Sequence, residues 1–69
     1  MTKTEILEDI GRRQAEAQEN MRAFQRIVDV YERNNDEINA SYFGQRVVKY
    51  SAIWSELQDV KEMLMNMEE

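Results

Sequence analysis

A polar break at the middle of the chain constrains the fold most strongly. Asn34-Asn35-Asp36-Glu37 divides 69 residues into two halves, and each half repeats apolar residues at steps of three and four. That period is typical of amphipathic helices. With no proline and only two glycines, the chain has almost nothing to end strands or form tight turns. The sequence therefore predicts an all-α fold, a single antiparallel two-helix hairpin domain over residues 1–69.

The first helix is expected over residues 3–33. Thr2 and Glu5 have the spacing of a capping box, in which each side chain bonds the other residue's backbone N–H. At roughly 100° per residue, the apolar side chains of this segment fall within an arc of about 120°, which is one core-facing stripe. The stripe is Ile6, Ile10, Ala17, Met21, Phe24, Val28 and Tyr31.

The turn is expected at residues 34–36 and the second helix over residues 37–66. Asn34 is the expected N-cap, with Glu37 completing a second capping box, although a later start near Ser41 is an alternative. The apolar face of this helix covers about 160°, so it is wider than that of the first helix. Its members are Phe43, Val47, Tyr50, Ile53, Trp54, Leu57, Val60, Leu64 and Met67.

The two faces do not match in width. Folding at residues 34–35 sets residue i against about 69 − i, which places Phe24 opposite Gly44. Residues 11–20 offer the core only Ala17 and direct Arg13 toward the core side, where an acidic residue of the facing helix or a partner can meet it. A lone hairpin would therefore leave much of Tyr50 and Trp54 in water.

A partner is expected to cover this surface, because burying a large aromatic side chain is worth about 1.5–3 kcal/mol. The leading candidate is a second copy, which would form an antiparallel four-helix bundle as a homodimer. The other is a helix of a different protein lying in the groove. The residues predicted to form the interface are Phe24, Val47, Tyr50, Ile53, Trp54 and Leu57.

No residue pattern indicates a catalytic, metal-binding or phosphate-binding site. The chain has no cysteine and no histidine, so thiolate and imidazole metal sites are excluded, and no glycine-rich phosphate loop or nucleophile–base pair occurs. We expect no enzyme, cofactor or metal. Apolar runs of two or three residues also exclude a membrane span or a signal peptide, which predicts a cytoplasmic protein.

Arginines give the first half a cationic appearance, and Arg13, Arg22 and Arg26 are candidate contacts for a protein partner or RNA. The competing interpretation is ordinary pairing with nearby acids such as Asp9, Glu19 and Asp29. The net charge of −5 falls mostly on residues 34–69, which disfavours general nucleic-acid binding.

In architecture alone, the chain resembles two kinds of small helical hairpin, and no site residue is transferred from either. One is the Rop family of plasmid copy-number regulators, whose acidic dimers bind RNA loop pairs. The other is the hairpin co-chaperone of type III secretion needle subunits. The predicted function is a homodimeric adaptor, regulator or assembly chaperone that binds another protein. The alternatives are a Rop-like binder of structured RNA and an obligate small subunit of a hetero-complex.

Overall fold

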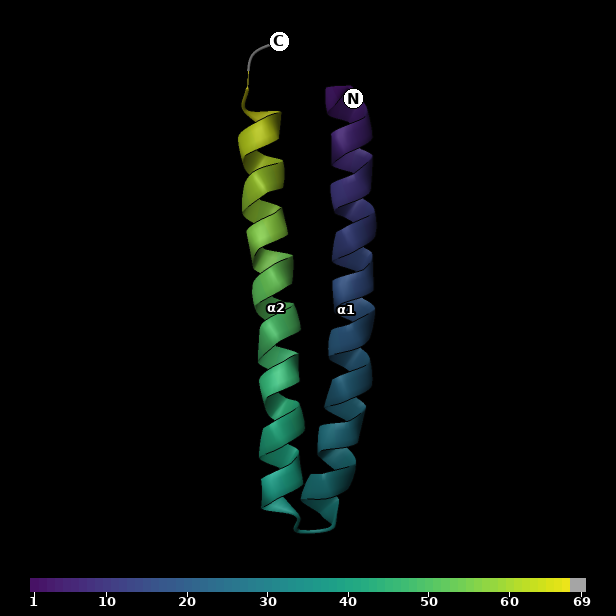
Figure 1. Ribbon diagram of the computed structural model, residues 1–69, viewed down its shortest axis with the longest axis vertical. Coiled ribbons are helices and arrows are strands. Elements are labelled where there is room, and N and C mark those ends of the chain that lie inside the picture. The colour runs from purple at the N-terminus through teal and green to yellow at the C-terminus, as the bar shows by residue number, and fades with distance from the viewer. Residues whose placement is uncertain (68–69) are drawn as a thin grey trace.

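The computed structural model describes residues 1–67, which form two long helices packed side by side. Helix α1 spans Lys3–Arg33 and helix α2 spans Glu37–Met65. They run antiparallel with the turn at one end and the two termini at the other, which we call the open end (Figure 1). The molecule is a rod with Cα extents of 54 × 15 × 13 Å. This confirms an all-helical hairpin, and no strand occurs within residues 1–67.

The N-terminus of α1 is fixed by the expected capping box. The backbone N–H of Glu5 donates to Thr2 Oγ1 over 3.2 Å, and the Thr2 N–H donates to Glu5 Oε1 over 3.4 Å. These bonds satisfy donors that the first turn of a helix otherwise leaves free. Helix α1 therefore begins at the predicted residue and with the predicted capping box.

The end of α1 is a Schellman motif. Asn35 has φ = 59°, in the left-handed region, and its N–H donates to the carbonyl of Glu32 over 3.1 Å. The N–H of Asp36 donates to the carbonyl of Tyr31 over 2.9 Å. Asparagine takes the position that glycine more often holds in this motif. A three-residue connection therefore reverses the chain.

The predicted N-cap of the second helix is wrong by two residues. Asn34 is instead the C-cap of α1, and its Nδ2 donates to the carbonyl of Val30 over 2.9 Å. Asp36 is the N-cap instead, and its Oδ1 accepts from the backbone N–H of Asn39 over 3.2 Å. The Schellman motif uses Asn34 and Asn35, so the next polar side chain is the first one available for capping.

The core between the helices is thin. Among the described residues, the apolar side chains less than a tenth exposed are Ile10, Ala17, Val28 and Ala40, and no side chain is less than 2% exposed. Two packed helices leave most residues between them open to solvent on one side. Most of the predicted stripe is consequently half-buried.

The predicted packing of Phe24 against Gly44 is also wrong. The Phe24 ring lies between Phe43 and Tyr50, at centroid distances of 6.2 and 5.7 Å. A Cβ built on Gly44 would meet no atom within 4 Å, apart from its own helix backbone and chain neighbours. Stacking of the large rings sets the local pairing, and it leaves the glycine facing open space.

Candidate interaction surface

A ladder of stacked aromatic rings runs along one side of the hairpin near the turn. Tyr31 stacks on Phe43 at 5.6 Å, and Phe24 continues the ladder from Phe43 to Tyr50. Tyr42 meets Phe43 edge-on at 5.0 Å. Rings from both helices alternate in this ladder, so it both joins the helices and presents a broad apolar surface.

Two cations lie over these rings. The guanidinium of Arg46 is 5.6 Å from the centroid of Phe24 and 5.3 Å from that of Tyr42, and it donates to Tyr42 Oη over 3.0 Å. Lys49 Nζ is 5.7 Å from the centroid of Tyr50. These are cation–π distances. Sequence reasoning missed both residues, although the i,i+4 spacing of Tyr42 and Arg46 was a signal for such a contact.

A groove continues this surface toward the open end. It has a volume of about 250 Å³ and is lined by Arg13, Glu16, Ala17, Asn20, Tyr50, Ile53 and Leu57. Residues seven apart in a helix share one side of it, so Ile27 follows Asn20 and Val60 follows Ile53. We call this side of the hairpin, with its aromatic ladder and this groove, the aromatic face.

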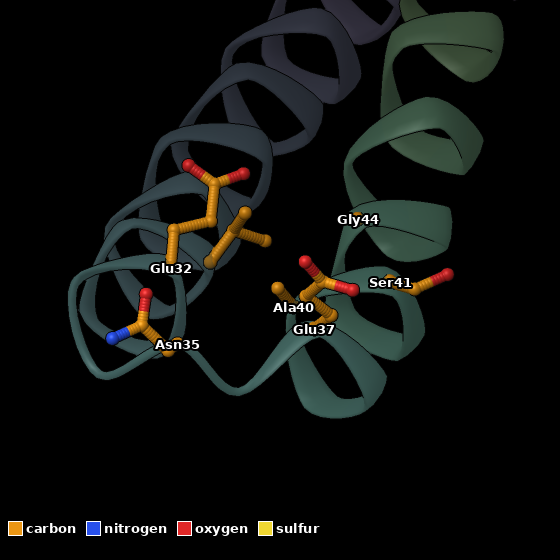
Figure 2. A pocket seen from close by; sticks show the side chains of 7 residues that line it. Glu32, Asn35, Glu37, Ala40, Ser41 and Gly44 are labelled. Atoms are coloured by element: carbon orange, nitrogen blue, oxygen red, sulfur yellow. The ribbon is translucent and has the colours of Figure 1, made fainter.

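A second groove of about 460 Å³ lies beside the turn, lined by Val28, Glu32, Asn35, Glu37, Ala40, Ser41 and Gly44 (Figure 2). Gly44 and Ile53 are nine residues apart in α2, which is roughly 180° around the helix at about 100° per residue. The two grooves therefore open on opposite sides of the hairpin. We call the side with the second groove, where Gly11 also lies, the glycine face.

The six predicted interface residues do not share one face. Phe24, Tyr50, Ile53 and Leu57 lie on the aromatic face, through the ring stack or the groove. Val47 and Trp54 follow Ala40 at seven-residue steps and therefore lie on the side of the glycine face. Tyr50 is half-buried and Trp54 is 37% exposed, so neither ring is enclosed by the hairpin alone.

The polar stretch of α1 meets α2 through a glutamine rather than through Arg13. Gln14 is 7% exposed, and its Nε2 donates to Gln58 Oε1 over 3.0 Å and to the carbonyl of Trp54 over 3.4 Å. Arg13 was expected on the core side. Its side chain is 65% exposed, and its Nε pairs with Asp9 Oδ2 at 2.9 Å. Gln14 lies between the helices because Gln58 of α2 can accept a hydrogen bond from its amide, whereas the guanidinium of Arg13 stays in water.

The three candidate arginines do not form one cluster. Arg22 and Arg26 lie one turn apart and line a shallow depression with Glu19, Asn20 and Ala23. Arg13 is nine residues away from Arg22, about 13 Å along the helix. Within residues 1–67, Arg22 and Arg26 make no ion pair, so the expected pairing with neighbouring acids is absent at these two positions.

Residues 1–67 lack two further features. They contain no group of three or more histidine, cysteine, aspartate or glutamate side chains placed to hold a metal ion. Neither α1 nor α2, within the same residues, carries a stretch long and apolar enough to cross a bilayer.

Comparison with protein-family models, with curated proteins and with solved structures finds no match to this chain.

Proposed function

We propose that this chain is a non-enzymatic protein–protein interaction module that works as a homodimer, in an adaptor, regulatory or assembly-chaperone role. One observation carries the proposal: most of the apolar stripe along which the two helices meet stays half-exposed in the hairpin alone. Only Ile10, Ala17, Val28 and Ala40 among the described apolar side chains are less than a tenth exposed. A contiguous exposed apolar strip on a small protein usually marks an interaction surface.

The exposed area supports the same proposal. The chain has 5472 Å² of accessible surface, whereas size scaling gives roughly 4,600 Å² for a folded monomer of 8.3 kDa. The excess of roughly 900 Å² is close to the ~800 Å² that each partner buries in a standard protein interface. A chain below about 70–80 residues without disulfide or metal commonly gains its stability by association.

Sedimentation equilibrium of the purified chain across micromolar concentrations tests this proposal. We expect a dimer in which Ile53→Glu weakens association at least about 100-fold, because the carboxylate would lose water on burial. Ala52→Glu is the matched control, since residue 52 is exposed and lies next to Ile53 on a different side of α2. A helical, cooperatively folding monomer at these concentrations would refute the proposal. A chain that is partly unfolded until a different protein is added would favour the obligate-subunit alternative.

Binding of structured RNA is the second candidate, and it is favoured by the guanidiniums of Arg22 and Arg26, which pair with no acid among residues 1–67. Such binding would release counterions, so affinity would fall steeply as salt rises. Titration of a panel of RNA hairpins and loop pairs at two salt concentrations tests this. Arg22→Gln/Arg26→Gln should then reduce both affinity and salt slope. An RNA affinity that changes neither with salt nor with the two substitutions would exclude RNA binding through these arginines.

A further inference from the structure

We infer that the second copy packs on the aromatic face in an antiparallel orientation, with the turns of the two hairpins at opposite ends of the bundle. This inference rests on the proposed self-association and adds the face and the direction. It follows from three observations: where the exposed apolar side chains lie, what the other face offers, and how charge is distributed along the rod.

Exposed apolar side chains run along the aromatic face from end to end. At the turn half, Ile27, Val30 and Tyr42 are between 36 and 53% exposed. Toward the open end, Val60 and Met63 are 44 and 68% exposed. The groove lined by Tyr50, Ile53 and Leu57 joins the two halves. The strip is therefore continuous over the length that a second hairpin would cover.

The glycine face is a weaker candidate because α1 contributes polar side chains to it. The helical positions on that side of α1, seven residues apart, hold Thr4, Gly11, Gln18, Gln25 and Glu32. All of these residues are exposed. On α2 the same side shows Val48, Trp54 and Met65. On the aromatic face, by contrast, both helices contribute exposed apolar side chains in the turn half, which suits it better to form the floor of a four-helix bundle.

Charge on the aromatic face changes sign along the rod. The turn half carries Arg46 and Lys49, which lie over the aromatic rings. The facing positions of α1 there are Asn20, Ala23, Ile27 and Val30, none of them charged. The open half carries three acids, Asp9, Glu16 and Glu56, and two cations, Arg13, which pairs with Asp9, and Lys3 at the very end of the rod. The two halves are therefore complementary in charge.

A twofold axis perpendicular to the rod, through its middle, would bring the cationic half of each copy onto the acidic half of the other. The centre of α2 is residue 51, and Arg46 and Glu56 lie five residues to either side of it. Antiparallel packing places Arg46 of one copy beside Glu56 of the other, at two equivalent positions. A parallel dimer would instead gather the Arg46 and Lys49 side chains of both copies at one end and their acids at the other.

Cysteine cross-linking tests the orientation, since the natural chain has no cysteine. In Arg46→Cys/Glu56→Cys, the two thiols of one chain lie about 15 Å apart along α2. A bis-maleimide shorter than that distance can link them only between antiparallel copies. We expect the double variant to form a covalent dimer and both single variants to remain largely unlinked. Sedimentation equilibrium before cross-linking shows whether the dimer is present at all.

The outcomes separate the two proposals. A protein that is dimeric by sedimentation but links in none of the three variants, or links equally well through single cysteines, overturns the antiparallel inference and leaves self-association standing. A monomer by sedimentation overturns both. Charge reversal gives a second measurement: Arg46→Glu should raise the dissociation constant roughly tenfold, and adding Glu56→Arg should recover most of that loss. A double variant no tighter than the single one contradicts the pairing.

Discussion

Replacing Gly11 and Gly44 by alanine is expected to stabilise the protein and to test which face the proposed second copy covers. Both glycines lie inside long helices, where glycine costs about 0.5–1 kcal/mol relative to alanine. A Cβ built at either position would have no neighbour from the facing helix or a nearby side chain within 4 Å. The added methyl group therefore causes no clash inside the hairpin.

The magnitude follows from helix propensity and from the separation of the two sites. In the hairpin, Gly11 and Gly44 lie roughly 20 Å apart along the rod, so their effects should add. We expect about 1–2 kcal/mol of additional stability for the double variant. For a domain of this size, each kcal/mol corresponds to about 4–8 °C in the midpoint of thermal unfolding.

Urea unfolding followed by circular dichroism, at one fixed protein concentration, measures the change. Ala52→Gly is the matched control, because it makes the reverse substitution at an exposed position of α2 and should cost about 1 kcal/mol. If Gly11→Ala or Gly44→Ala destabilises the protein or dissociates the dimer, another backbone approaches these glycines. That result would refute the assignment of the aromatic face to the second copy.

Substitutions at two other positions test the turn and the polar contact between the helices. Asn35→Ala should cost about 1 kcal/mol because alanine tolerates φ = 59° poorly, whereas Asn35→Gly should be neutral within a few tenths, as thermal unfolding would show. Gln14→Leu should raise stability by about 1 kcal/mol, since the gain from apolar burial exceeds the hydrogen bond lost to Gln58. A drop in the urea midpoint of Gln14→Leu would show that this bond contributes more than burial can replace.

The helices and the turn could be predicted because local signals determine them. Thr2 and Glu5 form the capping box that their spacing indicates. The break at residues 34–36 needed only polarity and its position between two periodic segments. Choosing the cap was harder, because Asn34 and Asp36 both have suitable side chains. The left-handed backbone of Asn35 decides between them, and no pattern of apolar residues reports a single φ angle.

The contacts between the helices could not be predicted in the same way. The predicted apolar stripe does not include Gln14. This residue is nevertheless more deeply buried than Phe24 or Tyr50, because Gln58 accepts a hydrogen bond from its amide. Pairing by residue number placed Phe24 at Gly44, whereas ring stacking with Phe43 and Tyr50 sets the observed arrangement. Both errors come from treating each helix separately when the partner side chain determines the outcome.

The proposed dimer also explains why the hairpin can keep polar groups at its own seam. The hydrogen bond between Gln14 and Gln58 specifies how the two helices pair but adds little hydrophobic stabilisation. The aromatic face holds the apolar area that a single hairpin cannot bury. Covering it with a second copy would make folding and association one equilibrium. The midpoint of unfolding should then rise with protein concentration, as mass action requires of any structure whose core is completed by its partner.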